Sequence, residues 1–198
     1  MDFTINNLNP TIYPTNVIGI GTAYYDLEAR VDKVFMESLS LPPGEWCKEQ
    51  NLEIFNHLLE KVMTYLQTSS LKATLGGSAG NVVRALQALG TPSALFCKLG
   101  EDLISEQYQR AMISLGARVI IQPSATPVSR ILVLIEGGNR KFICNQTLSL
   151  DLEPSSLSKE TFAGIKSLHL EGYSVGEFQI EFLEKIQPGI KPVRPGLK

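Results

Sequence analysis

Short apolar segments alternate along this chain with longer segments whose apolar residues recur at every third or fourth position. The short segments are typical of buried strands, and the longer ones are typical of amphipathic helices. Alternation of this kind predicts an α/β fold, with a mostly parallel sheet covered by helices. The predicted strands are 17–21, 93–99, 119–122 and 166–170, and the predicted helices are 52–66, 82–89, 104–115 and 178–186.

A second pattern interrupts this alternation. Residues 129–135 and 140–145 are rich in β-forming residues and are joined by Glu-Gly-Gly-Asn, which is a hairpin signal. We expect a small β lid beside the main sheet, with strands from about 25–35 and 120–145. Arg130 and Arg140 are expected to be solvated charges on the hairpin.

Composition excludes several classes of function. A net charge of −2 over 198 residues offers no basic face for nucleic acid. The longest purely apolar run, 131–135, is far too short to cross a membrane, so no membrane partner is expected. Three cysteines without a Cys-x-x-Cys pair indicate free thiols in a reducing cytoplasm. The two histidines have no ligand partner at helical spacing, so no metal site is predicted.

The first glycine-rich segment runs from Gly19 to Asp26 as Gly-Ile-Gly-Thr-Ala-Tyr-Tyr-Asp. It begins like a dinucleotide-binding fingerprint, but Tyr24 replaces the third glycine, and Asp26 follows too soon to be the ribose-binding acid. A nicotinamide cofactor is therefore a minor alternative. One interpretation is structural, a strand end whose glycines permit tight packing. The functional interpretation places Asp26 at the carboxyl end of a parallel strand, where its carboxylate can accept hydrogen bonds from vicinal sugar hydroxyls.

The second segment, Gly76 to Asn81, reads Gly-Gly-Ser-Ala-Gly-Asn and comes directly before a predicted helix. Adjacent glycines allow a ligand to approach the backbone, and the amides at a helix start point outward as donors. The Asn81 side chain can both donate to and accept from a hydroxyl. No lysine followed by serine or threonine stands at Walker spacing, which excludes a triphosphate P-loop. The alternative is a plain glycine turn in which Ser78 or Asn81 only caps the helix.

Taken together, these segments resemble the PfkB (ribokinase-like) family of carbohydrate kinases. The stretch Gly76 to Gly90, Gly-Gly-Ser-Ala-Gly-Asn-Val-Val-Arg-Ala-Leu-Gln-Ala-Leu-Gly, is similar to the family's N-terminal signature. Supporting similarities are Val-Ile-Gly-Ile-Gly at 17–21 with Asp26, Lys-Leu-Gly-Glu-Asp at 98–102, and Leu-Gly-Ala-Arg-Val at 115–119. The long interval between Asp26 and Gly76 resembles the adenosine-kinase-like subgroup. Two positions depart from the pattern: Thr22 replaces an asparagine typical of adenosine kinases, and Ser105 replaces a common glycine.

The resemblance implies a ribokinase-like α/β fold over 1–187, followed by an irregular Pro/Gly-rich tail at 188–198. It implies that a sugar or nucleoside is held under the lid, and that the family's reaction uses ATP and Mg²⁺. The implied substrate-binding residues are Asp26, Gly76, Gly77, Ser78 and Asn81.

The family's second signature, of Gly-Ala-Gly-Asp type, supplies the catalytic base, and no such sequence occurs in this chain. We therefore expect the chain to carry the sugar-binding half without the ATP-binding and catalytic half, to contain no catalytic residue of its own, and to be inactive alone. The second hypothesis is a non-catalytic interaction module, derived from a sugar kinase, that self-associates through the lid or an exposed sheet edge.

Overall fold

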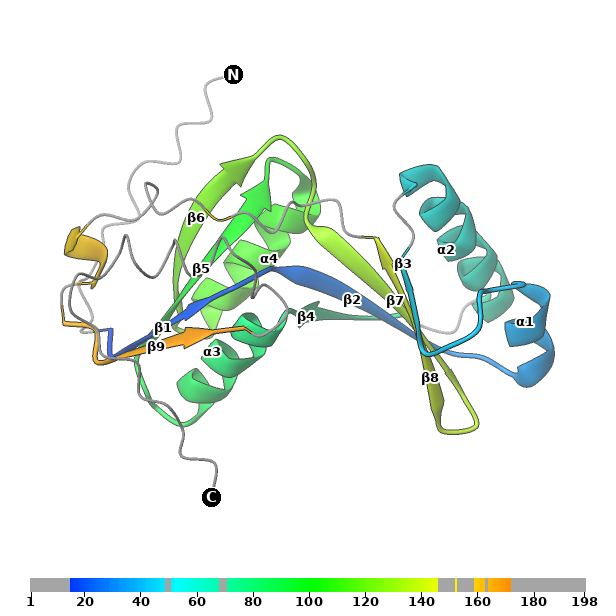
Figure 1. Ribbon diagram of the computed structural model, residues 1–198, viewed down its shortest axis with the longest axis horizontal. Coiled ribbons are helices and arrows are strands. Elements are labelled where there is room, and N and C mark those ends of the chain that lie inside the picture. Colours follow the sequence, from blue (N-terminus) through cyan, green and yellow to red (C-terminus); the bar gives the residue numbers. More distant parts are fainter. Residues whose placement is uncertain are drawn as a thin grey trace.

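The computed structural model describes residues 15–48, 51–67, 71–145, 152, 159–162 and 164–171. The predicted helix over 178–186 and the tail at 188–198 lie outside the described residues. Within the described residues, two β-sheets meet where strand β2 follows β1, and each sheet carries helices on one side (Figure 1).

The first sheet has four parallel strands in the order β6-β5-β1-β9. Helices α3 and α4 lie against one face, where Ala79, Val83, Tyr108 and Met112 pack on the strands. Phe96 and its neighbours form a second apolar cluster that contains Ile18 and Ile20. Because its strands are all parallel and helices pack on it, this sheet confirms the predicted α/β class. The elements are β1 (Val17–Ile20), β5 (Ser93–Gly100), β6 (Arg118–Ser124), β9 (Ser167–Leu170), α3 (Ser78–Ala88), α4 (Leu103–Ser114) and the 3₁₀ helix η2 (Lys159–Phe162).

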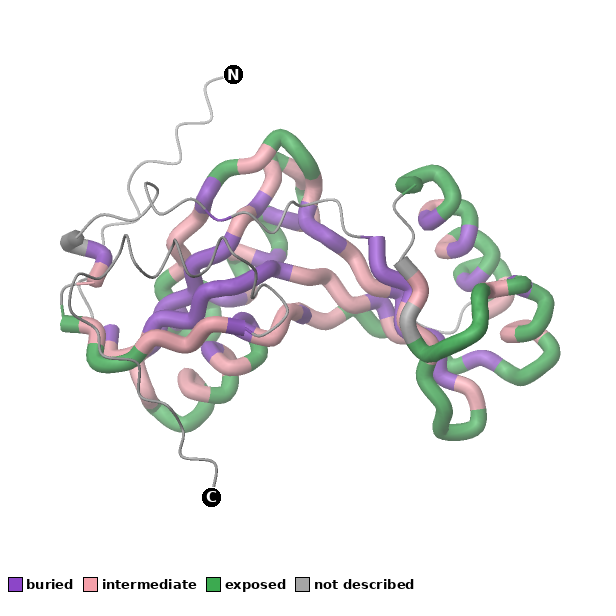
Figure 2. Tube along the Cα trace, in the orientation of Figure 1, coloured by how far each residue is buried: buried purple, intermediate pink, exposed green. Residues whose placement is uncertain are grey.

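The second sheet, here called the lid, has five strands in the order β3-β8-β7-β2-β4. Its β2 and β7 are parallel, whereas β7 and β8 form the predicted antiparallel hairpin. One face of the lid packs on α2 through a cluster that includes Leu27, Leu132, Phe55 and Val62. The lid residues that pack on α2, Leu27 and Leu132 among them, are buried (Figure 2). The elements are β2 (Tyr24–Arg30), α1 (Lys33–Ser38), β3 (Trp46–Lys48), α2 (Leu52–Leu66), β4 (Lys72–Gly76), β7 (Ser129–Glu136) and β8 (Asn139–Asn145).

Two features of the lid were not foreseen. Helix α1 begins after Asp32, whose side chain accepts a hydrogen bond from the Phe35 amide and caps the helix. The expectation that Arg130 is solvated is wrong, because its guanidinium stands 5.0 Å from the centre of the Phe55 ring and donates to Asn56 Oδ1. Arg140 is exposed, as expected. The lid is therefore fastened to α2 by one of the two arginines.

Candidate functional site

Asp26 and Gly76 lie together on neighbouring strands of the lid. The expectation that Asp26 follows the carboxyl end of a parallel strand is wrong, because β1 ends at Ile20 and Asp26 is the third residue of β2. In the antiparallel pair β2–β4, Tyr24 is opposite Gly76 and Asp26 is opposite Thr74. The Asp26 carboxyl group lies against the Gly76 backbone, so an added Cβ at Gly76 would lie only 2.5 Å from Asp26 Cγ. Glycine at 76 is therefore required for the carboxyl group to occupy this place.

The carboxyl group of Asp26 is half-buried and incompletely bonded. Its Oδ1 atom is buried and has no hydrogen-bond partner among the described residues. Burial raises the pKa of Asp26 to about 6, and the positive charge of Arg84 acts in the opposite direction. A buried carboxylate oxygen without a donor is costly unless a ligand supplies one, so this atom is suited to accept a hydrogen bond from a hydroxyl group.

The turn between β4 and α3 is tight because two glycines follow one another. Gly77 is the N-cap of α3 and has a φ of +93°. An added Cβ at this position would clash with the carbonyl oxygen of Thr22. Gly77 holds the cap position and no side chain makes a cap hydrogen bond, so neither Ser78 nor Asn81 caps this helix; a plain glycine turn stays the alternative to a binding site. The backbone N–H of Asn81 donates to Gly77 O at 2.9 Å, and its side chain is exposed on the first turn of α3.

Arg84 lies one turn further along α3 and connects the two sides of the glycine turn. Its Nη1 atom donates to Leu75 O at 2.7 Å and to Asn81 Oδ1 at 3.1 Å. These contacts fasten the end of β4 to the start of α3. Arg84 belongs to the quoted signature, but sequence reasoning did not single it out.

Glu171 is a further site residue that sequence reasoning missed. It follows β9 directly and is 2% exposed. Its Oε1 accepts from the backbone N–H of Thr22 at 2.7 Å, and its Oε2 accepts from that of Ala79 at 3.3 Å. The side chain also lies against Gly21, where an added Cβ would clash with the carboxyl group. Glu171 therefore joins the large sheet to the β1–β2 connection and to the start of α3.

We expect Glu171→Gln to lower the free energy of unfolding by about 2 kcal/mol, because an amide NH₂ would then face a buried backbone N–H. Urea unfolding followed by circular dichroism measures this loss. The matched control is Glu101→Gln at an exposed position, where we expect a change within about 0.5 kcal/mol. Equal stability of Glu171→Gln and the wild type would show that Glu171 does not hold these two amides together.

Two tyrosines complete the surroundings of Asp26. The hydroxyl of Tyr108 on α4 donates to Gly76 O at 3.0 Å, and its ring is fully buried. Burial raises the pKa of Tyr108 well above its ordinary value. Burial, reinforced by Cys144 and Glu171, likewise raises the pKa of Tyr24, so both phenols stay neutral. Among the described residues, Arg84 is therefore the cation whose charge acts on the Asp26 carboxyl group.

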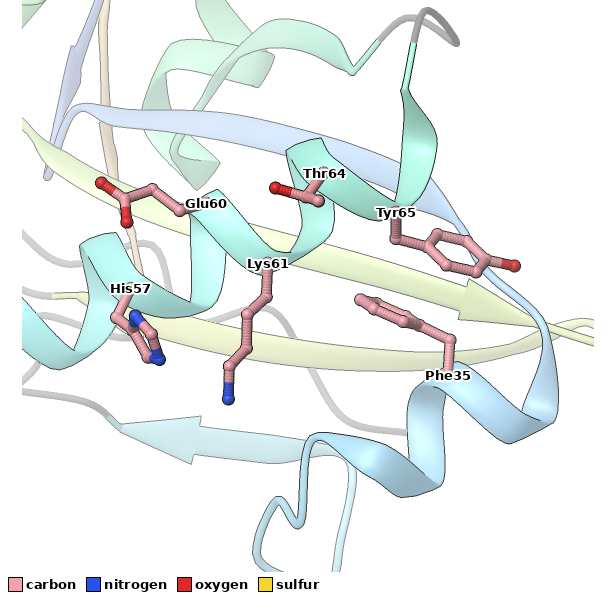
Figure 3. A pocket seen from close by; sticks show the side chains of 6 residues that line it. All are labelled: Phe35, His57, Glu60, Lys61, Thr64 and Tyr65. Atoms are coloured by element: carbon pink, nitrogen blue, oxygen red, sulfur yellow. The ribbon is translucent and has the colours of Figure 1, made fainter.

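A pocket of about 420 Å³ lies elsewhere, over the lid helices (Figure 3). Phe35 of α1 stacks on Tyr65 of α2 with ring centres 4.0 Å apart, while His57, Lys61 and Thr64 project from α2. Because α2 covers the lid face that carries Leu27, this pocket is on the side of the lid opposite to Asp26. We assign the site to the surroundings of Asp26 because the buried unpaired oxygen and the glycine turn are there.

No cluster of three or more His, Cys, Asp or Glu side chains suited to a metal ion occurs in the part of the chain that the structure describes. Among the same residues, no helix combines the length and the apolar character that crossing a membrane requires.

The same fold occurs in solved kinase structures. Adenosine kinase from Sinorhizobium meliloti matches with a TM-score of 0.68 and 24% identity, over 81% of this chain and 48% of that chain. Adenosine kinase from Anopheles gambiae, in complex with P1,P4-di(adenosine-5) tetraphosphate, matches with a TM-score of 0.70 and 23% identity, over 86% and 55%. A probable sugar kinase from Rhizobium etli matches with a TM-score of 0.68 and 20% identity, over 81% and 48%.

This chain therefore spans about half the length of the solved structures it matches. The parallel sheet, its covering helices and the lid define the ribokinase-like class of α/β fold. The family model for the pfkB family carbohydrate kinases matches residues 51–188, and the chain belongs to that family. No curated protein matches the sequence.

Proposed function

We propose that the residues around Asp26 bind the hydroxyl groups of a sugar or nucleoside, and that this binding is the contribution of this chain to the phosphoryl-transfer chemistry of its family. Asp26 accepts from the ligand, Asn81 makes a further hydrogen bond, and Gly76, Gly77 and Ser78 supply backbone that a ligand can approach closely. The long β2-to-β4 connection, which contains α1 and α2, supports a nucleoside as the ligand, because the length of this interval in the sequence resembles that of adenosine-kinase-like proteins. Adenosine kinase from Schistosoma mansoni is known in complex with 2-fluoroadenosine.

The observation that carries the proposal is the buried, unpartnered Oδ1 of Asp26 beside a glycine that makes room for it. A carboxylate that only stabilised the fold would be expected to have its oxygens bonded within the protein. Here no hydrogen bond within the described structure offsets the burial of Oδ1, which is typical of a group that meets its partner in a ligand.

The described site residues do not fit the triphosphate of ATP. Asp26 and Glu171 bring two carboxyl groups to this place, and like charges would repel the phosphates. Among the amides at the start of α3, that of Ala79 donates to Glu171. One of the donors that a helix start offers to an anion is thus bonded to the protein's own carboxylate. We therefore assign hydroxyl binding to these residues and derive no phosphoryl-transfer step through them.

Thermal unfolding of the purified chain tests the proposal with adenosine, inosine, guanosine, ribose, fructose, ATP with magnesium, and NAD. A ligand at about 100 times its Kd stabilises the folded state by about 2.7 kcal/mol, which raises the melting temperature by several degrees. We expect one of the neutral hydroxylated compounds to give this shift, and ATP and NAD to give none.

Two outcomes would overturn the proposal. A shift with NAD alone would favour the nicotinamide alternative that rests on Gly19 and Gly21. Cooperative melting that none of the compounds changes would show that the site binds no sugar or nucleoside. The interaction-module hypothesis would then take precedence, and sedimentation equilibrium would measure the self-association that it requires.

A further inference from the structure

Arg84 contacts the Leu75 carbonyl oxygen and the Asn81 side chain, and the second contact fixes the orientation of the Asn81 amide group. A guanidinium group carries only donors, so the Asn81 atom that it contacts at 3.1 Å must be the amide oxygen. With Oδ1 turned toward Arg84, the NH₂ group is the end of the Asn81 side chain that points away from the arginine. The side chain of Asn81 is thereby oriented so that its donor end is the one left facing other groups.

The second contact fixes the place of the arginine itself. Its Nη1 also donates to Leu75 O at 2.7 Å, at the end of β4 and next to Gly76. Residues 81 and 84 are three apart on α3 and so lie on the same face of the helix. One nitrogen therefore bridges the glycine turn and sets Asn81 relative to the strand against which Asp26 packs.

The third element is the charge. Arg84 is half-buried, and within the described residues no carboxylate comes within the 4.0 Å of an ion pair with it. Its charge nevertheless reaches Asp26, where it opposes the effect of burial on the pKa of that carboxyl group. Both Asp26 oxygens therefore lie more than 4.0 Å from the guanidinium nitrogens, while the positive charge of Arg84 still favours the ionised form of the Asp26 carboxyl group.

We propose that Arg84 is a positioning residue of this site: it turns the NH₂ group of Asn81 toward the ligand and places a positive charge beside Asp26 without pairing with it. The site then offers one acceptor and one donor of fixed polarity. It selects a ligand oxygen that can donate to Asp26 and accept from Asn81, which is the property of a free hydroxyl group. This inference rests on the proposed function but goes beyond it. It states that Arg84, which does not touch the ligand, determines that Asp26 accepts and that Asn81 donates.

Other charged and titratable groups around Asp26 do not perform this role. Tyr24 and Tyr108 have raised pKa values and stay neutral, and Glu171 is engaged by the amides of Thr22 and Ala79.

The electrostatic part is tested in the ligand-free protein, so that it does not depend on finding the ligand. The carboxyl carbon of Asp26 is titrated by ¹³C NMR and assigned by its absence in Asp26→Asn. Arg84→Gln should move the titration midpoint upward by ~0.5 unit, because a charge is removed at a distance beyond direct contact. Arg84→Lys keeps the charge and should leave the midpoint near that of the wild type. Arg118→Gln removes an exposed arginine on β6 and is the control, with no shift expected. An unchanged midpoint in Arg84→Gln would overturn this part.

The orientation part has one readout without ligand and one with it. In the free protein, the side-chain amide signals of Asn81 should move in both Arg84→Lys and Arg84→Gln, and should stay in place in Arg118→Gln. With adenosine and ribose as probes, Asn81→Asp should weaken binding about 10-fold or more, since it keeps an oxygen facing Arg84 but replaces the NH₂ donor with a charged acceptor. Its melting temperature without ligand should not fall. Amide signals unaffected by Arg84, or full binding by Asn81→Asp, would overturn the inference. A wild-type chain that binds neither probe would instead contradict the proposed function, and the two ligand-free measurements would still decide the role of Arg84.

Discussion

Replacing Asp26 with asparagine should weaken ligand binding by about 100-fold and, at the same time, make the ligand-free protein more stable at neutral pH. The loss follows from the removal of a charged acceptor, because hydrogen bonds to charged groups contribute roughly 1.5–3 kcal/mol. The gain follows from burial, because the Oδ1 atom of Asp26 is buried without a partner among the described residues. A neutral side chain of the same shape avoids the cost of burying the charge.

The sign of the pH dependence follows from the raised pKa. Asp26 titrates at about 6 in the folded protein, against 3.8 for an ordinary aspartate. Folding therefore favours the protonated form. The stabilisation that this gives is fully present below about pH 4 and is lost as the pH rises through about 6. After allowance for the solvent that reaches this half-buried group, we expect Asp26→Asn to stabilise the free protein by about 1 kcal/mol above pH 7.

Thermal unfolding between pH 4 and pH 8 measures the change in stability and the loss of binding. It is carried out without ligand and with the sugar or nucleoside that stabilises the wild type. The stability advantage of Asp26→Asn should appear above about pH 6 and vanish near pH 4. The matched control is Glu28→Gln, since Glu28 lies two residues on, on the same face of β2, and loses the same charge. A variant that is less stable than the wild type at neutral pH would show that Asp26 holds the fold together. A variant that binds as the wild type would remove Asp26 from the site.

The sequence was sufficient to predict the parts of the fold that follow from local patterns. Helix α2 ends at Leu66, as its apolar spacing requires, and the hairpin of β7 and β8 turns at Gly137 and Gly138. Both features depend on residues that are near one another in the chain, so local periodicity and turn chemistry determine them. Short helix α1 was missed because six residues are too few to show a period.

The partners of each strand were harder to foresee. β4 precedes α3 in sequence, yet it joins the lid and pairs antiparallel to β2. The alternation of polar and apolar residues within a strand does not identify the strands that lie next to it in the sheet. The lid strand expected at about 25–35 is β2, but it ends at Arg30, and α1 begins at Lys33. Tyr24, Asp26 and Glu28 alternate on one face of β2 and weaken its apolar pattern. A strand with polar side chains on one face is less apolar than a strand of the core, so the residues of the candidate site weaken the strand pattern.

The candidate site shows the same limit. Asp26 and the glycine turn were predicted separately, and the β2–β4 pairing brings them together. Glu171 could have been found by the rule that was applied to Asp26, since it directly follows the parallel strand β9, whereas Asp26 lies within β2. Its significance comes from contacts with Thr22 and Ala79, which are 149 and 92 residues away in the chain. Contacts over such separations are set by the crossover topology and leave no local trace.

The largest loss of stability should come from Gly77→Ala. Gly77 has a φ of +93°, and an added Cβ would clash with the carbonyl oxygen of Thr22. That oxygen belongs to the backbone and cannot turn aside as the end of a long side chain could. Thr22 is moreover held by its N–H bond to Glu171. We expect Gly77→Ala to cost at least about 3 kcal/mol, the sum of a strained backbone angle and a steric clash.

Gly138→Ala separates the two parts of this cost. Gly138 also has a φ of +93°, in the turn between β7 and β8, but an added Cβ there would meet no heavy atom within 4 Å. This variant should therefore lose only the backbone part, about 1–2 kcal/mol, as judged by urea unfolding with unchanged m-value. The difference between the two variants measures how firmly the Thr22 carbonyl is fixed. Equal losses would mean that the β1–β2 connection moves aside freely. Glu171 would then not hold the β1–β2 connection in place, and the close packing of Gly77 against the Thr22 carbonyl oxygen would not be a rigid part of the site.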